Sequence, residues 1–180
     1  MKSLLLLDAD IVIDLHKVGL WKAVTSQYKV HLPSTIIGEI KYYPRGNERV
    51  PIDLTPDFSS GAVVEVSVDP IDQKKVYDLL VSKKVDAVHD GEREALSFIY
   101  FHNDEPFRIA LKDHVAISAA VVLSVIEKAM SVEAMLKDIG VALPKTSPLL
   151  YELSEKRFAK YRAEGAFLSI EAEKSRRKKK

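Results

Sequence analysis

The strongest constraint on the fold is an uninterrupted run of four leucines, Leu4–Leu7, followed at once by Asp8. A short run without polar alternation is typical of a strand whose two faces are both buried in a parallel sheet. Asp8 and Asp10 end the apolar run far short of the hydrophobic segment of a secretory signal, so we expect a cytoplasmic protein. The chain is therefore predicted to begin with a buried parallel strand that ends at a carboxylate.

Strand-like and helix-like patterns alternate along the rest of the chain. Strands are expected at 28–32, 62–68 and 107–111, and helices at 11–20, 34–40, 72–83, 92–101, 115–128, 131–140 and 147–165. Ser34 and Ser131 are predicted to cap the helices that they precede. Residues 41–61, rich in proline and glycine, are predicted to form a long loop or a hairpin. This alternation favours an α/β fold with a mostly parallel central sheet and helices on both of its faces.

Composition limits the class of protein. The 180 residues are 47% hydrophobic and 29% charged, which is ordinary for a soluble domain, and the longest nearly apolar run is 12 residues, where a membrane span needs about 20. We therefore expect no membrane partner. The absence of cysteine excludes disulfides, thiolate metal sites and a cysteine nucleophile.

The basic charge is concentrated at the C-terminus. Residues 174–180 hold six basic side chains and no acid, whereas the other 173 residues carry a net charge of −5. We predict a domain over 1–145, a C-terminal helix over 146–168 that packs on it or on a partner, and a disordered basic tail over 169–180. A loose electrostatic contact of this tail with a polyanion such as RNA is the functional alternative.

Four separate segments place carboxylates at one edge of the predicted sheet. Asp8 and Asp113 directly follow strands, Glu39 lies one turn into a helix, and Glu92 and Glu94 open another helix. Ligands of open α/β sheets bind beyond the carboxyl ends of the strands, so these acids are expected in one crevice. Clustered carboxylates repel one another unless a cation joins them, and hard oxygen ligands favour Mg²⁺ or Mn²⁺. Such ions can activate water for attack on a phosphodiester.

In their order and spacing these segments resemble the PIN-domain ribonucleases, from residue 4 to about residue 140. The matching segments are Leu4–Asp8, Leu32–Ile40, Gly91–Ala95 and Leu111–Ala116. The resemblance implies a three-layer α/β/α PIN-like fold with a central, mostly parallel sheet. It also implies that the catalytic and metal-binding acids, which hold one or two Mg²⁺ or Mn²⁺ ions, are Asp8, Glu39, Glu92 and Asp113, with Glu94 and Asp10 as alternates.

Two positions depart from the pattern of that family. Asp10 stands where many members carry threonine or serine, and Lys112 stands where many carry a second acid. Lys112 either lowers the local negative charge or weakens metal binding. We expect Lys112, Arg93 and Arg45 to contact the substrate.

The function implied by the resemblance is metal-dependent hydrolysis of RNA by an endoribonuclease. Cleavage of RNA that is single-stranded or in a loop would leave a 5′-phosphate and a 3′-hydroxyl. Small members of the family commonly serve as the toxin of a toxin–antitoxin pair, so an antitoxin protein and a second copy of the chain, in a homodimer, are the expected partners.

Two alternatives stay open. The opening segment also resembles haloacid-dehalogenase-like phosphatases, in which Asp8 would attack phosphorus and Asp10 would act as acid and base, with Ser34 and Lys112 in supporting roles. The Gly-Thr pair usual after the second aspartate of that family is missing. The second alternative is a catalytically inactive PIN-like scaffold that binds RNA or protein.

Overall fold

A central parallel sheet organises the chain. The computed structural model describes residues 2–6, 8–85, 87–145 and 147–177. Within them, five strands form one sheet in the order β5-β2-β1-β6-β7, and every pairing is parallel. Their bounds are β1 Lys2–Leu6, β2 Tyr28–Pro33, β5 Val63–Val66, β6 Phe107–Ala110 and β7 Ala129–Met130. The prediction of an α/β fold with a parallel sheet is therefore confirmed.

The strand β1 lies in the centre of this sheet. Leu5 pairs with His31 of β2, and Leu6 pairs with Ala110 of β6. Because all strands run in one direction, the segments that follow β1, β2 and β6 leave the sheet at the same edge. Leu7 and the predicted burial of the leucine side chains lie outside the described residues.

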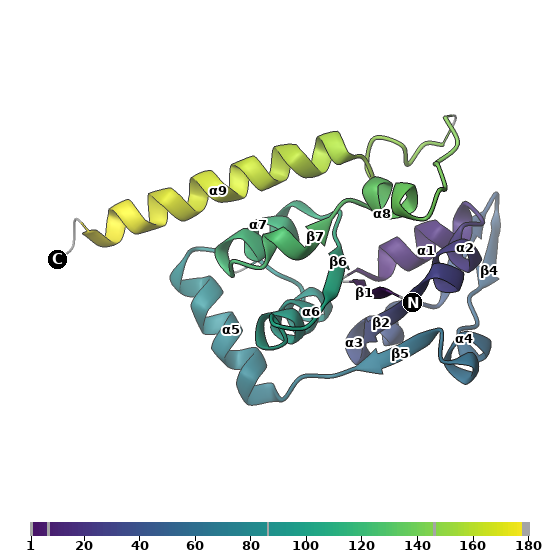
Figure 1. Ribbon diagram of the computed structural model, residues 1–180, viewed down its shortest axis with the longest axis horizontal. Helices are drawn as coiled ribbons and strands as arrows, with labels where there is room; N and C mark the ends of the chain where they lie inside the picture. The colour runs from purple at the N-terminus through teal and green to yellow at the C-terminus, as the bar shows by residue number, and fades with distance from the viewer. Residues whose placement is uncertain (1, 7, 86, 146, 178–180) are drawn as a thin grey trace.

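Helices surround the sheet on both faces (Figure 1). They are α1 Ala9–Lys17, α2 Trp21–Gln27, α3 Ser34–Glu39, α4 Thr55–Ser60, α5 Pro70–Ser82, α6 Asp90–Phe101, α7 His114–Val122, α8 Val132–Asp138 and α9 Glu155–Arg177. The buried hydrophobic residues form two clusters. Ala110 of β6 belongs to the cluster that contains residues of α1, α2 and α8, and its neighbour Ile109 belongs to the cluster that contains residues of α5, α6 and α7. Successive residues of a strand point to opposite faces, so each cluster occupies one face of the sheet.

The irregular stretch 41–61 contains the predicted hairpin and a helix that was not predicted. Strands β3 Tyr42–Arg45 and β4 Glu48–Pro51 pair antiparallel, and α4 follows them. The prediction of Ser131 as a helix cap is confirmed, since its Oγ accepts a hydrogen bond from the Ala134 amide at 3.0 Å. Ser34 is instead the first residue of α3, and Pro33 occupies the cap position.

The helix predicted over 115–128 is shorter in the structure, which is a correction. Helix α7 ends at Val122, and Ser124 adopts a left-handed backbone with φ of 60°, which an α-helix cannot contain. A 3₁₀ turn at Ile126–Lys128 then leads into the short edge strand β7. Strand β7 is the edge strand of the sheet, and its two residues are too few to show an alternation of polar and apolar residues in the sequence.

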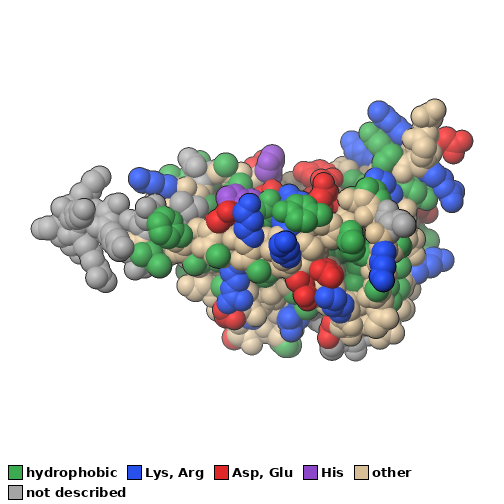
Figure 2. Space-filling view, turned by 90° about the horizontal axis from the view of Figure 1, so that it is seen from above, with side chains coloured by type: hydrophobic (Ala, Val, Ile, Leu, Met, Phe, Trp, Pro, Cys, Tyr) green, Lys and Arg blue, Asp and Glu red, His purple; other side chains and the backbone are tan. Residues whose placement is uncertain are grey.

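The C-terminal helix also differs from its prediction over 147–165. Residues 148–153 form turns, and α9 begins at Glu155 and continues to Arg177, so much of the predicted disordered tail at 169–180 is helical. Helix α9 packs along α7 (Figure 1), and a Cβ added to Gly165 would lie 2.9 Å from the Ser118 Cα. The face of the molecule seen in Figure 2 carries acidic and basic side chains interspersed. Among the described residues, no helix combines the length and the apolar character that crossing a membrane requires.

Candidate functional site: an acidic pocket at the carboxyl edge of the sheet

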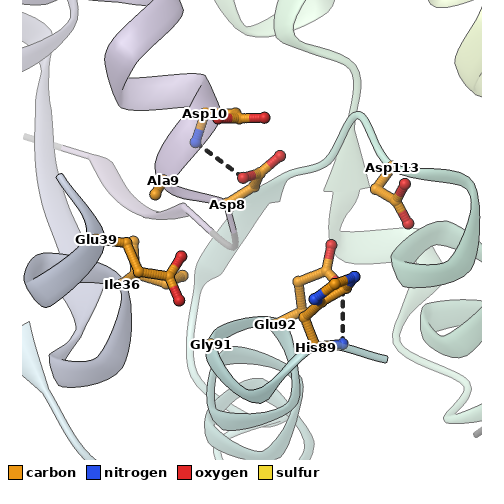
Figure 3. Close-up of a pocket in the computed structure, with 9 residues that line it drawn as sticks. All are labelled: Asp8, Ala9, Asp10, Ile36, Glu39, His89, Gly91, Glu92 and Asp113. Carbon is orange, nitrogen blue, oxygen red and sulfur yellow. Dashed lines mark hydrogen bonds between the residues drawn. The ribbon is translucent and has the colours of Figure 1, made fainter. Parts of the chain in front are cut away.

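A pocket of about 270 Å³ lies where β1, β2 and β6 end. We call it the acidic pocket, and it is lined by Asp8, Ala9, Asp10, Ile36, Glu39, His89, Gly91, Glu92 and Asp113 (Figure 3). The structure thus brings together four of the acids that the sequence places at this edge, Asp8, Glu39, Glu92 and Asp113. They come from four segments that are far apart in the chain.

Asp8 and Asp113 are each fixed by the helix that they begin. The Oδ1 atom of Asp8 accepts a hydrogen bond from the Asp10 amide at 2.8 Å, at the start of α1. The Oδ1 atom of Asp113 accepts from the amides of Val115 and Ala116 at 2.7 and 3.2 Å, at the start of α7. Both carboxylates therefore satisfy helix amides that would otherwise lack partners, and both lie at the positive end of a helix dipole.

Close contact between α3 and α6 brings the two glutamates to the same pocket. Glu39 is the last residue of α3, and Glu92 lies in the first turn of α6. A Cβ on Gly91 would lie only 2.8 Å from Ile36 Cγ1, so the absence of a side chain at Gly91 permits this approach. Figure 3 shows Glu39 on one side of the pocket, with Glu92 and Asp113 on the other.

Glu94, the alternate to Glu92, serves a different purpose. Its side chain is only 3% exposed and accepts hydrogen bonds from Ser34 Oγ at 3.0 Å, from the Thr35 amide at 3.1 Å and from the Thr35 hydroxyl. This carboxylate joins α6 to the start of α3 and faces α3 instead of the pocket. The geometry therefore selects Glu92 as the acid of this segment that reaches the pocket.

The electrostatics of Glu92 reflect its surroundings. Burial and, next, the nearby Asp113 carboxylate raise the pKa of Glu92 to about 7, and Asp8 and Glu39 contribute to the same effect. A hydrogen bond from the His89 amide, at 3.3 Å, opposes the rise by stabilising the charged form. The charged form of Glu92 is therefore disfavoured, first by burial and then by the neighbouring carboxylates.

Lys112 forms an ion-pair cluster beside the acidic pocket. Its Nζ lies 2.9 Å from Asp14 Oδ2, 3.6 Å from Asp10 Oδ2 and 3.8 Å from Asp8 Oδ2. Burial alone would lower the pKa of Lys112, but these carboxylates outweigh it and raise the pKa. Burial also raises the pKa of Asp8, and the charge of Lys112 opposes that rise.

Asp14 is the member of this cluster that sequence reasoning missed. It is 9% exposed on α1, one helical turn after Asp10. Residues four apart lie on the same face of a helix, so the Asp10–Asp14 spacing was a signal that could have found it.

The other predicted substrate contacts lie away from the pocket. Arg93 forms an ion pair with Asp90 at 2.8 Å, and its guanidinium lies 5.4 Å from the ring centroid of Tyr77, which places it against α5. Arg45 is exposed on the β3–β4 hairpin. A role for either arginine in RNA binding stays a prediction.

The acids of the pocket offer carboxylate oxygens, which suit a hard cation, but these oxygens do not converge on one point. Among the described residues, no group of three or more His, Asp or Glu side chains is arranged closely enough to hold a metal ion. The pocket nevertheless offers carboxylate oxygens from four segments, and mutual repulsion is one cause of the raised pKa of Glu92. This donor chemistry fits Mg²⁺ or Mn²⁺, whose charge would relieve that repulsion.

The fold and the pocket define an α/β protein whose parallel sheet carries an acidic cluster at its carboxyl edge. Comparisons with known proteins give no match, whether to a family model, to a curated protein or to a solved structure. The resemblance to PIN-domain ribonucleases consequently rests on the four sequence segments alone.

Proposed function

We propose that this protein is a metal-dependent endoribonuclease with a three-layer PIN-like fold. The observation that carries the proposal is the meeting of Asp8, Glu39, Glu92 and Asp113 in one pocket. Such a concentration of carboxylates lowers stability in the absence of a cation, so a structural role alone does not account for it. The central position of β1, between β2 and β6, supports the proposal because it directs three of the four segments to one edge.

The four pocket acids would hold the cation, and Mg²⁺ or Mn²⁺ would supply an activated water and stabilise the charge that develops on the phosphodiester. The amides at the starts of α1 and α7 orient Asp8 and Asp113, each by its Oδ1 atom. A cation in the pocket would favour the charged form of Glu92, whose pKa of about 7 comes from burial and, next, from the neighbouring carboxylates. The products would be a 5′-phosphate and a 3′-hydroxyl on single-stranded RNA.

The biological role follows from the same resemblance. We propose a cytoplasmic toxin of a toxin–antitoxin pair that acts as a homodimer and is held by an antitoxin protein. Exposed apolar side chains on α9, Phe167 and Ile170, support an interface with a protein partner.

One observation favours a second candidate, a haloacid-dehalogenase-like phosphatase. Lys112 lies 3.8 Å from Asp8, where a lysine could support an aspartyl nucleophile. Against it, the hydroxyl of Ser34 donates to Glu94 and is therefore engaged elsewhere. The nuclease accounts for more of the residues in the pocket.

A single assay separates these functions. Purified protein is incubated with labelled single-stranded RNA or with a generic phosphomonoester, in the presence of Mn²⁺, Mg²⁺ or EDTA. We expect RNA cleavage that requires the metal and is lost in Asp113→Asn. The matched control is Asp69→Asn, because Asp69 caps α5 in the same way, accepting from the Ile71 amide at 2.7 Å, but lies outside the pocket.

The outcomes are distinct. Turnover of the phosphomonoester without RNA cleavage would replace the nuclease with the phosphatase. Silence with both substrates would refute enzymatic activity of either kind and favour an inactive scaffold. Equal RNA cleavage by wild type and Asp113→Asn would refute the assignment of the pocket as the active site.

A further inference from the structure

Lys112 places a positive charge among carboxylates beside the acidic pocket. In sites with two metal ions the ions lie about 4 Å apart, and they share or approach the same carboxylates. Lys112 already lies within 4 Å of three carboxylates, those of Asp14, Asp10 and Asp8. Its ammonium group would repel a divalent ion placed near these oxygens.

The two oxygens of Asp8 have different surroundings. Oδ1 accepts the hydrogen bond from the Asp10 amide, and Oδ2 faces the Lys112 ammonium at 3.8 Å. A second divalent ion that approached Asp8 through Oδ2 would therefore meet the positive charge of Lys112.

Asp14 holds Lys112 in this place. The pair is separated by 2.9 Å, and the two side chains are only 12% and 15% exposed. Screening by water is weak for partners buried to this degree, so this ion pair holds the lysine in position. Lys112 is absent from the lining of the acidic pocket, as far as the described residues define it, and so acts on Asp8 from outside.

We propose that Lys112, anchored by Asp14, is a resident cation that neutralises Asp8 and restricts the acidic pocket to a single divalent ion. The inference rests on the proposed function, because it concerns the metal site of the proposed nuclease. In this arrangement Lys112 and Asp14 are positioning residues that set the charge of the pocket.

The first test counts the ions bound to the full-length protein. Mn²⁺ is titrated calorimetrically, and the electron paramagnetic resonance spectrum of the bound ion is recorded. We expect one Mn²⁺ per chain, lost in Asp113→Asn, with the spectrum of an isolated ion. A spectrum of two magnetically coupled Mn²⁺ ions would overturn the inference and leave the nuclease proposal intact. No binding of Mn²⁺ at the pocket would instead overturn the nuclease proposal itself.

The second test removes the positive charge of Lys112 in one variant and the negative charge of Asp14 in another. Lys112→Met should bind Mn²⁺ about tenfold more tightly, because a nearby positive charge is lost, and Asp14→Asn should bind it about tenfold more weakly. Lys112→Arg keeps the charge and should bind Mn²⁺ as the wild type does. A purely structural pair would not shift the affinity in opposite directions in the two variants.

The matched control is Lys137→Met. Lys137 also lies between two carboxylates, Glu133 at 3.1 Å and Glu155 at 3.2 Å, but on α8, so its removal should leave Mn²⁺ binding unchanged. Unchanged or weaker binding by Lys112→Met would overturn the inference. If that variant does not fold, Asp14→Asn decides alone, and an unchanged affinity in it refutes the role of the pair.

Discussion

Replacement of Glu92 by glutamine should stabilise the metal-free protein at neutral and alkaline pH. Burial and neighbouring carboxylates raise the pKa of Glu92 from 4.5 to about 7. Each pKa unit corresponds to about 1.4 kcal/mol, so the ionised side chain costs the folded state about 3 kcal/mol. Glutamine carries no charge and keeps an oxygen that can accept the hydrogen bond from the His89 amide.

The pH dependence follows from the direction of this shift. Below about pH 4.5 the glutamate is protonated in both the folded and the unfolded chain, and its charge costs nothing. Between about pH 4.5 and 7 the unfolded chain loses this proton first, so the folded state binds more protons and stability falls as the pH rises. Above about pH 7 the cost is complete and constant. The advantage of Glu92→Gln should therefore grow from near zero at pH 4 to about 3 kcal/mol at pH 8.

The assay is urea denaturation in EDTA at several pH values, with the free energy of unfolding compared between wild type and variant. Glu94→Gln is the informative control, because Glu94 is only 3% exposed and accepts hydrogen bonds from Ser34 and Thr35. The NH₂ group of a glutamine at this position would face the donor groups of Ser34 and Thr35, and one of these hydrogen bonds would be lost. This variant should therefore be destabilised. Equal stability of wild type and Glu92→Gln at pH 8 would refute the reasoning that the acidic pocket is under electrostatic strain.

Three further substitutions test other parts of the structure. Asp8→Asn should abolish RNA cleavage while leaving the melting temperature unchanged or higher, because burial raises the pKa of Asp8 and its charge is therefore unfavourable. The wild type should lose stability as the pH falls below about 6.5, and His31→Phe should lack this loss, as thermal melts from pH 7.5 to 5 would show. Both ring nitrogens of His31 are buried without a hydrogen-bond partner among the described residues, and burial followed by the charge of Lys29 lowers its pKa, so acid must force a charge into the core. Gly165→Ala should cost about 1–3 kcal/mol, since its Cβ would meet the Ser118 backbone, whereas Gly38→Ala, with open space around it, should be neutral or stabilising. Equal denaturation midpoints for the two glycine variants would contradict the packing of α9 on α7.

The sheet and the acidic edge could be predicted because each leaves a local signal. A short apolar run that ends in an acid marks a buried strand and its exit, and the strands observed at Tyr28–Pro33 and Phe107–Ala110 lie within a residue of their predictions. The edge strand β7 gave no such signal, since two residues are too few for any period. Helix α9 was misplaced because Pro148 is equally at home in the turns that precede Glu155.

The choice between Glu92 and Glu94 shows a different limit. Residues two apart in a helix point about 200° away from each other, so only one of them can face the pocket. The sequence gives the spacing but not the rotation of α6 about its axis. That rotation is set by the contact of Gly91 with Ile36 and by the hydrogen bonds from Ser34 and Thr35 to Glu94, all of which are long-range.

Part of the charge in the acidic pocket is locally compensated. Asp8 and Asp113 each cap a helix, and Lys112 adds a buried positive charge near Asp8. Glu92 also caps its helix, through the His89 amide, yet burial and the nearby Asp113 carboxylate outweigh that hydrogen bond and raise its pKa. Glu92 and the neighbouring Asp113 therefore repel each other across the acidic pocket. A divalent ion held by the four acids of the acidic pocket would relieve this repulsion and favour the charged form of Glu92.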